Sequence, residues 1–176
     1  LDCKEVEPET RCPCGYAGDP SGRCCCTFDR VRSYRGKLSG PLLDRIDMHV
    51  VLPPVDVASL RTARLGESSS QVRARVEVAR ARQSERHKLG QVSAPVNSLL
   101  SSRDIDAVSA PDDAGAKMLV SAVERLGLSA RAYTKVLRVA RTIADLDGTE
   151  KVRAEHIAEA ISARILDRNE GHSREA

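Results

Sequence analysis

Arg45 stands at a junction between two predicted elements, where an arginine is well placed to bind phosphate. Residues 38–46 predict a turn followed by a short helix, and residues 47–52 predict a strand. A planar, permanently charged guanidinium on a rigid mount fits the oxygens of a phosphate group. The ordinary alternative is an ion pair between Arg45 and Asp44 or Asp47, which is the common role of such an arginine.

Four cysteines form two short pairs that could hold one metal ion. Cys12 pairs with Cys14, Cys24 pairs with Cys26, and a segment rich in Gly, Asp, Pro and Ser separates the pairs. Closing this short loop costs little conformational entropy, and four thiolates could enclose one tetrahedral Zn²⁺. The spacing within each pair is C-x-C rather than the commoner C-x-x-C, and disulfide bonds are the alternative, which a cytosolic chain disfavours. Cys25 is an extra thiol that we expect to point away.

Arg131 is the second arginine suited to phosphate. It follows Ser129, the expected N-cap of a helix over residues 130–146. A cation in the first turn opposes the helix dipole at a cost of up to ~1 kcal/mol. An arginine at this unfavourable position therefore suggests a functional role. Free N–H groups beside an arginine make a good phosphate site. The alternative is a surface arginine tolerated at that small cost.

Helices must position most of these side chains. Apolar periodicity and capping residues predict helices over residues 27–38, 68–88, 103–108, 111–126, 130–146 and 153–166. Ser68 with Gln71 forms a capping box, Pro111 is expected in a first turn, and Gly127 is expected to stop a helix. The expected buried positions are Val72, Val76, Ala79, Met118, Leu119, Val123, Leu126, Tyr133, Val136, Leu137, Ala140, Ile143, Ala144, Ile157, Ala160, Ile161 and Ile165.

Composition narrows the class of protein. The 176 residues are 41% hydrophobic and 30% charged, with three Tyr, one Phe and no Trp, which favours small helical cores of aliphatic residues. No apolar run approaches the ~20 residues of a membrane span, and no signal peptide is recognisable, so we expect a cytoplasmic protein. The net charge of +3 includes basic clusters in residues 30–37 and 73–88, which permit nucleic-acid binding without requiring it.

Two runs of residues resemble one family. The run LSGPLLDRID at residues 38–47 is similar to the arginine-finger segment of Mg-chelatase-like AAA+ ATPases, specifically the ComM/YifB group. LGLSARAY at residues 126–133, continued by LRVARTIADL at residues 137–146, resembles the C-terminal helical lid of the same group.

The resemblance implies a fold and a division of the chain. The fold would be mainly α: the end of an α/β AAA+ core, with a cysteine knuckle, short helices and the last strand, followed by an all-helical lid domain. The divisions implied are an atypical start at 1–11, the core end at 12–55, a linker at 56–66, the lid at 67–166 and a polar tail at 167–176. Where the family has a sensor Asn-Pro before the knuckle, this chain has Thr10-Arg11, which puts that sensor's role in doubt here.

The resemblance also implies roles for the candidate residues. Arg45 would be the arginine finger, acting in trans on the ATP site of a neighbouring subunit. Arg131 would be the second sensor arginine, touching the terminal phosphate of ATP. Cys12, Cys14, Cys24 and Cys26 would form a metal knuckle, with structural Zn²⁺ as the metal.

The activity implied is that of an ATP-dependent motor using ATP and Mg²⁺. It would form a homo-oligomer, a hexamer, and act on DNA in branch migration and natural transformation. No G-x-x-x-x-G-K-[ST] occurs in the sequence, so we expect this chain alone to be catalytically inactive. The alternative is a non-enzymatic zinc-knuckle and helical module that binds nucleic acid through its basic faces.

Overall fold

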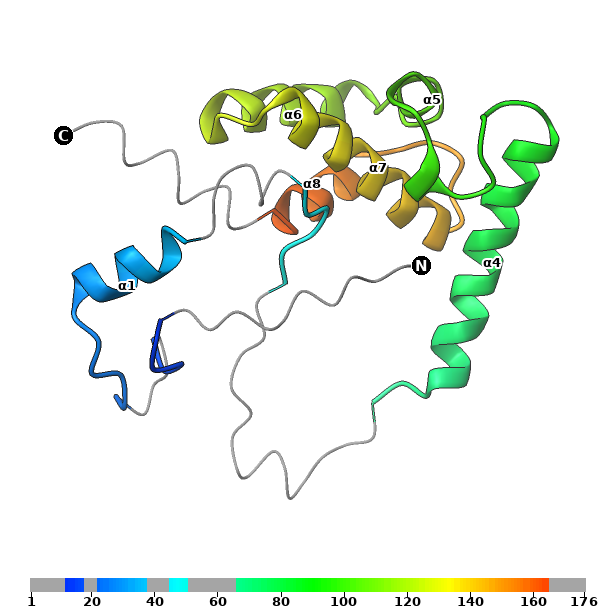
Figure 1. Cartoon of the computed structure of the whole chain (residues 1–176). Coiled ribbons are helices and arrows are strands. Elements are labelled where there is room, and N and C mark those ends of the chain that lie inside the picture. Colours follow the sequence, from blue (N-terminus) through cyan, green and yellow to red (C-terminus); the bar gives the residue numbers. More distant parts are fainter. Residues whose placement is uncertain (1–11, 18–21, 38–44, 51–65, 165–176) are drawn as a thin grey trace.

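The computed structural model describes residues 12–17, 22–37, 45–50 and 66–164. Within these residues the protein is mainly helical, as the sequence predicted (Figure 1). The predicted start at 1–11, the tail at 167–176 and most of the linker at 56–66 lie outside the described residues. No helix in the part of the chain that is described is long and apolar enough to cross a membrane.

The first helix, α1, covers Phe28–Arg35 and follows the cysteine segment. Thr27 caps it as predicted, because its side chain accepts a hydrogen bond from the backbone N–H of Arg30 at 3.4 Å. The helix ends at Arg35 rather than Leu38, with Gly36 as its C-cap, since glycine is a poor helix former.

Helix α4 covers Ser69–Lys88. Its predicted capping box is confirmed: the Ser68 side chain accepts from the Gln71 backbone, and the Ser68 N–H donates to Gln71 Oε1 at 2.9 Å. A single 3₁₀ turn, η1, follows at Asn97–Leu99, inside a segment that the sequence predicted as loop.

Four further helices complete the bundle. They are α5 at Ser102–Val108, α6 at Asp113–Leu126, α7 at Ala130–Leu146 and α8 at Ala154–Ser162. Ser129 caps α7 and Gly127 ends α6 with a φ of 61°, both as predicted, because a left-handed residue at a helix end favours glycine. The start of α6 was predicted wrongly: Asp112 is its N-cap, and Pro111 lies outside the helix in an isolated parallel bridge to Val152.

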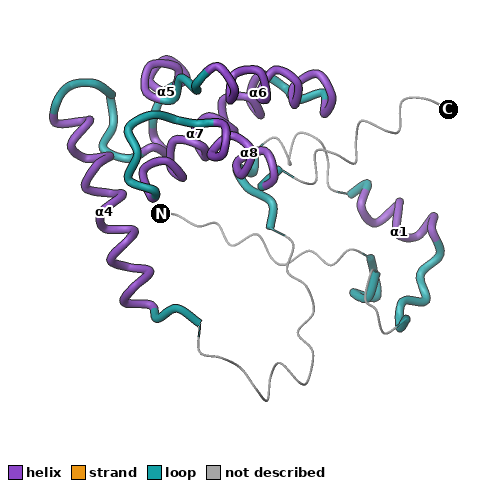
Figure 2. The backbone as a smooth tube through the Cα atoms, turned by 180° about the vertical axis from the view of Figure 1, so that it is seen from behind, coloured by secondary structure: helices purple, strands orange, loops and turns teal. Residues whose placement is uncertain are grey.

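Helix α7 is the centre of the bundle. It packs against α4, α5, α8 and η1, and α6 covers α8, as Figures 1 and 2 show from opposite sides. The core is aliphatic and is formed by residues of α5 to α8 and of the loops beside them: Val92, Leu100, Ile105, Leu119, Val136, Leu137, Val139, Ala140, Ala144, Val152, Ile157, Ala160 and Ile161. Helices α5 to α8 therefore share one hydrophobic core.

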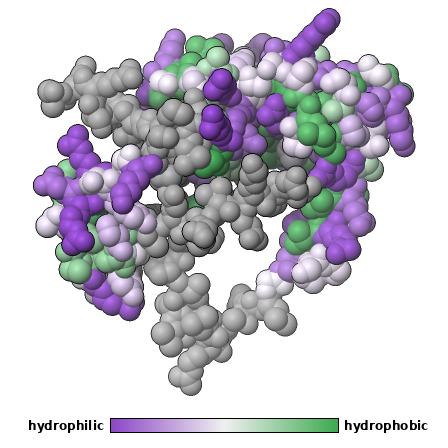
Figure 3. Space-filling model, in the orientation of Figure 1, coloured by the Kyte–Doolittle hydropathy of each residue, from purple (hydrophilic) through white to green (hydrophobic). Residues whose placement is uncertain are grey.

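Burial differs from prediction on the outer helix faces. Ala79 is buried in α4, but Val72 and Val76 are 40% and 41% exposed, because the N-terminal half of α4 projects beyond α7 (Figure 1). Green apolar patches alternate with purple polar ones along this projecting part in Figure 3. Met118 of α6 and Tyr133 of α7 were also predicted to be buried and are exposed. Ile165 lies outside the described residues.

The predicted strand over residues 47–52 is not observed in its described part. Residues 47–50 lie in no strand, and residues 51–52 fall outside the described residues. A strand needs a neighbouring strand to pair its backbone groups, and the described residues offer none. Instead, the N–H of His49 donates to the carbonyl of Ala163 at the end of α8, at 2.5 Å.

Candidate functional site

The cysteine cluster has the geometry of a four-thiolate metal site. The Sγ atoms of Cys12, Cys14, Cys24 and Cys26 all lie within 4.8 Å of one another. Cys12 Sγ is 3.3 Å from Cys14 Sγ and 3.8 Å from Cys24 Sγ, and the latter two are 3.7 Å apart. Zinc–sulfur bonds of about 2.3 Å in a tetrahedron place sulfurs about 3.8 Å apart. The cluster therefore fits Zn²⁺ with little rearrangement.

A tight turn shapes this cluster. The N–H of Gly15 donates to the carbonyl of Cys12 at 2.9 Å, and Gly15 has a φ of 83°, which favours glycine. The N–H of Ala17 donates to Cys12 Sγ at 3.2 Å. Backbone N–H groups aimed at sulfur stabilise a thiolate, which is the form that binds metal.

The thiols also influence one another. A hydrogen bond from the backbone of Tyr16, assisted by Cys12, lowers the pKa of Cys14 to about 6. The neighbouring Cys14 raises the pKa of Cys26 to about 11. Cys25 is exposed and lies outside the cluster, as expected, and none of the five described cysteines forms a disulfide. These observations favour the metal site over the disulfide alternative.

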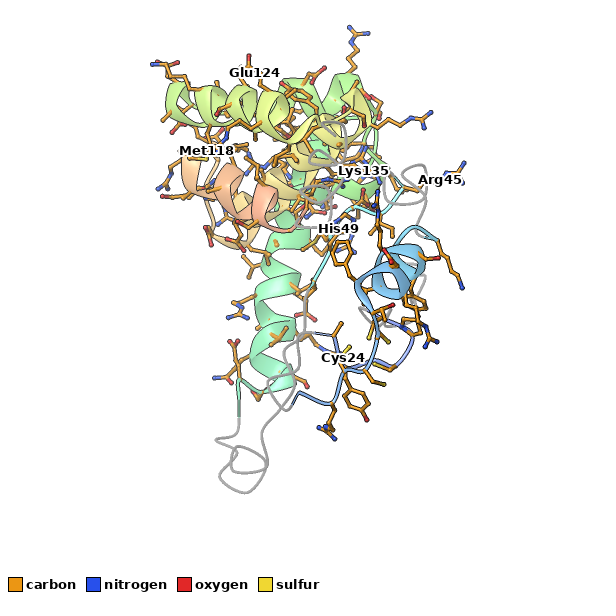
Figure 4. All side chains as sticks on the ribbon, turned by 90° about the vertical axis from the view of Figure 1, so that its left-hand side faces the viewer. Cys24, Arg45, His49, Met118, Glu124 and Lys135 are labelled. Carbon is orange, nitrogen blue, oxygen red and sulfur yellow. The ribbon has the colours of Figure 1, made fainter. Side chains whose placement is uncertain are left out.

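Arg45 is exposed on a segment that is fastened to the helical bundle. Arg164, at the end of α8, donates from Nη1 to the carbonyls of Ile46 at 2.9 Å and Asp47 at 3.4 Å. Lys135 of α7 forms an ion pair with Asp47, with Nζ 2.9 Å from Oδ1. Figure 4 shows the Arg45 side chain extending away from the bundle while Lys135 lies on the helix side. The fastening therefore leaves the guanidinium of Arg45 available to an external anion.

These contacts test one half of the alternative in which Arg45 pairs with Asp44 or Asp47. Asp47 pairs with Lys135 rather than with Arg45, and Asp44 lies outside the described residues. Arg45 forms no ion pair with any residue that the structure describes.

Arg131 is exposed in the first turn of α7, where the sequence placed it. The Ser129 cap accepts from the N–H of Ala132 at 3.1 Å. Arg131 precedes Lys135 by four residues, so the two side chains share one face of α7. Because Lys135 contacts Asp47, the segment carrying Arg45 lies beside the helix face that carries Arg131.

The structure brings the segments that carry Arg45 and Arg131 together. The cysteine cluster lies apart from both of them. Cys24 and its neighbours lie next to α1, apart from the helices of the bundle, in Figures 1 and 4. Sequence reasoning missed Lys135 and Arg164, whose partners lie far away along the chain. No local signal marks them, because an arginine or lysine on a helix normally faces solvent.

Two comparisons with protein families cover most of the chain. Residues 66–164 match the family described as magnesium chelatase, subunit ChlI C-terminal. The chain belongs to this Mg-chelatase-like family. Residues 3–60 also match the description magnesium chelatase, subunit ChlI, so the Mg-chelatase-like relationship includes the cysteine cluster and the Arg45 segment.

Bacterial proteins of the ComM and YifB type are similar over most of this Mg-chelatase-like chain. The competence protein ComM of Haemophilus influenzae is 37% identical over 155 residues, which are 85% of this chain and 29% of ComM. The uncharacterized protein YifB of Escherichia coli is 39% identical over 145 residues, 81% of this chain and 27% of YifB. An uncharacterized protein of Mycobacterium tuberculosis is 38% identical over 155 residues, 87% of this chain and 29% of that protein. The chain thus spans less than a third of the length of these relatives.

Proposed function

We propose that this chain is the C-terminal part of an ATP-dependent AAA+ motor of the ComM/YifB group that acts on DNA. One observation carries the proposal. The segment of Arg45 is held against α7 and α8 through Asp47, while Arg45 itself stays exposed. Such an arginine is mounted rigidly and points outward, as a group acting on a neighbouring subunit must.

Arg45 would act in trans in a ring of subunits, with six as the proposed number. Its guanidinium would stabilise the negative charge that spreads over the oxygens of the transferred phosphoryl group. Arg131 would contact the terminal phosphate from the first turn of α7. Two such cations, fixed before the reaction, lower its barrier without reorganisation at the moment of transfer.

ATP and Mg²⁺ would be held mainly by residues outside this sequence. The chain contains no G-x-x-x-x-G-K-[ST], the loop whose backbone surrounds the phosphates. When bound, Mg²⁺ neutralises charge on the phosphates. This chain contributes arginine side chains that bind and orient phosphate oxygens.

The cysteine cluster would hold a structural Zn²⁺ through Cys12, Cys14, Cys24 and Cys26. A four-thiolate site leaves no coordination position for a substrate, so the ion would fix local structure rather than react. We place the protein in the cytoplasm, where reducing conditions keep thiols available for metal.

The relatives support the DNA part of the proposal. The name of the Haemophilus influenzae relative links that protein to competence. We extend this to a motor that acts on DNA in branch migration and natural transformation.

The test needs an assembly that also contains a nucleotide-binding part. A chimera in which residues 12–176 replace the corresponding part of E. coli YifB provides one. Arg45→Ala should lower its ATP turnover by about three orders of magnitude, the usual worth of an arginine finger, while ATP binding survives. Mixing Arg45→Ala subunits with subunits unable to bind ATP should restore part of the activity, because each supplies what the other lacks.

Arg103→Ala is the matched control, since Arg103 is an exposed arginine on α5 with no hydrogen bond or ion pair to the described residues. Its turnover should stay unchanged. Equal turnover in Arg45→Ala and the unsubstituted chimera would refute the finger assignment.

A second function, a non-enzymatic nucleic-acid module, is favoured by the surroundings of the cysteine cluster. Arg23 stacks on Tyr16 at 4.8 Å from the ring centroid, and Lys37 lies 5.7 Å from that of Tyr34. Phe28 is 79% exposed. Exposed aromatic rings beside basic groups suit stacking of single-stranded bases.

The basic cluster on α4, within residues 73–88, supports this second function less well. Arg82 donates to the carbonyl of Gly148 at 2.7 Å, Arg86 pairs with Asp145, and Arg75 pairs with Glu67 at 2.8 Å. The charges of these three arginines are engaged within the protein. Binding of a labelled single-stranded oligonucleotide to the isolated chain, weakened by salt and by Phe28→Ala, would support the module; no binding at low salt would exclude it.

A further inference from the structure

We propose that Lys135 and Arg164 are positioning residues that fasten the Arg45 segment to the helical bundle, so that Arg45 and Arg131 move as one body. This inference rests on the proposed function of Arg45. Lys135 and Arg164 would act through Asp47 and the adjoining backbone, without touching the nucleotide themselves.

The end of α8 provides the first half of the fastening. The carbonyls of the last turn of a helix lack partners inside the helix. At this end, the carbonyl of Ala163, the C-cap of α8, accepts from the N–H of His49. Arg164 is 1% exposed and donates back to the carbonyls of Ile46 and Asp47. The segment and the helix end thus satisfy each other's backbone groups.

Helix α7 provides the second half. The Lys135 side chain is only 13% exposed, so its methylene stem is covered, and its ammonium group reaches Asp47, which is 50% exposed. This pair joins residues far apart in sequence, and it joins the segment of the proposed finger to the helix of the proposed sensor.

The consequence is mechanical coupling. Lys135 lies one helical turn from Arg131, on the same face of α7. Asp47 lies two residues from Arg45. A rotation of α7 that moves Arg131 therefore pulls on Asp47, and through it on Arg45. Both guanidinium groups would reach or leave a nucleotide together.

Amide hydrogen exchange in the 176-residue chain tests the fastening directly. The His49 amide should be protected, because it donates to Ala163. Lys135→Met should speed exchange at residues 46–50 about fivefold, the effect of losing one partly exposed ion pair. Arg164→Met should speed it more, and Arg164→Lys less, because lysine keeps one donor but loses the guanidinium fork.

Two further variants make the test specific. The double variant Asp47→Lys with Lys135→Asp swaps the two charges and should restore the protection of the amides of residues 46–50. Lys117→Met is the matched control, since Lys117 is exposed on α6 without a hydrogen bond or ion pair to the described residues, and it should not change the rate of amide exchange. If the amides of residues 46–50 exchanged at the wild-type rate in both Lys135→Met and Arg164→Lys, the proposal that these residues fasten the segment would be overturned.

ATP turnover in the YifB chimera tests the positioning role. Lys135→Met should lower kcat and leave KM for ATP unchanged, and the charge exchange should restore kcat. A lysine that touched phosphate directly could not be replaced by an acid, so failure of the exchange variant to recover turnover would overturn positioning. If Arg45→Ala kept full turnover, the proposed function of Arg45 would be refuted instead. The amide hydrogen-exchange rates would still decide whether Lys135 and Arg164 fasten the segment.

Discussion

Arg86 of α4 binds the buried carboxylate of Asp145 with both terminal nitrogens, at 2.6 Å and 2.5 Å. Asp145 is fully buried on α7 and also pairs with Arg141 at 3.0 Å. Asn97 of η1 donates to the same carboxylate at 2.8 Å. One acid therefore joins α4, η1 and α7 where the apolar stripe of α4 is too thin to do so.

Removing this acid should destabilise the bundle strongly. Arg141 is 2% exposed, and burial lowers its pKa while Asp145 opposes that effect. Asp145→Ala leaves Arg141 as an uncompensated buried charge, so the free energy of unfolding should fall by about 3–5 kcal/mol. Urea denaturation followed by circular dichroism measures this change.

Glu124→Ala is the control for this loss. Glu124 lies on the outer face of α6, as Figure 4 shows, and it is exposed. Its removal should change stability by less than about 0.5 kcal/mol. A similarly small effect of Asp145→Ala would mean that the α4–α7 contact does not depend on the network.

The helices could be predicted from sequence wherever local chemistry defines them. Ser68 with Gln71, Ser129 and Gly127 each mark a helix end, because capping uses neighbouring residues. The helix start at Pro111 was predicted wrongly, since proline fits both a first turn and the pairing with Val152 that tertiary structure selects. Of the thin apolar stripe predicted for α4, only Ala79 is buried, because sequence periodicity cannot reveal how far a helix projects beyond its partner.

The same difference between local patterns and long-range contacts decides which parts of the candidate site could be predicted from sequence. The four cysteines lie in one short segment, so their grouping could be predicted from spacing. The contacts of Arg164 with Ile46 and Asp47 span 118 and 117 residues, and neither partner carries a local pattern. The Asp145 network was missed for the same reason, although Arg141 and Asp145 share the i,i+4 spacing of a helical ion pair.

Asp104 should give the protein a pH-dependent contribution to stability. Hydroxyl groups of Ser101 and Ser93 donate to its carboxylate at 2.6 Å and 2.5 Å, which lowers its pKa from 3.8 to about 2. The unfolded chain binds the proton more tightly, so this stability is present above pH 4 and is lost as pH falls towards 2. The difference in Tm between the wild type and Asp104→Asn should be constant from pH 5 to 7 and narrow below pH 4. Asp106→Asn, on an exposed position of the same helix, should show no such narrowing.

The cysteine cluster should bind one zinc per chain. The distances from Cys24 Sγ to Cys12 Sγ and Cys14 Sγ, 3.8 Å and 3.7 Å, match a tetrahedral site, and metal binding supplies folding energy to such loops. Protein purified without chelator should contain close to one zinc by elemental analysis, and replacing Cys12 and Cys24 with Ser should remove it.

Cys25 provides the control for zinc binding. It is exposed and adjacent to two of the proposed ligands, so Cys25→Ser should keep the metal. Absence of metal, with all six thiols freely reactive in the folded protein, would contradict a structural zinc site.

The isolated chain should neither bind ATP tightly nor hydrolyse it. Without a phosphate-binding loop, Arg131 offers one exposed charged contact, worth about 1 kcal/mol at most. Titration calorimetry should detect no binding at micromolar ATP. Micromolar affinity would show that this chain contains a nucleotide site of another kind.

The helical unit should fold on its own when residues 67–166 are produced separately. Its core is contributed by helices α5 to α8 and the loops beside them, and the Asp145 network adds α4 and η1 within the same segment. Among the contacts of the described residues, those of residues 46–49 with Lys135, Ala163 and Arg164 would be lost. Far-UV circular dichroism should therefore show one cooperative melt, at a lower Tm than in the whole chain. A gradual, featureless melt would mean that the bundle needs the Arg45 segment to fold, and the docked segment would then be part of the core rather than an attachment to it.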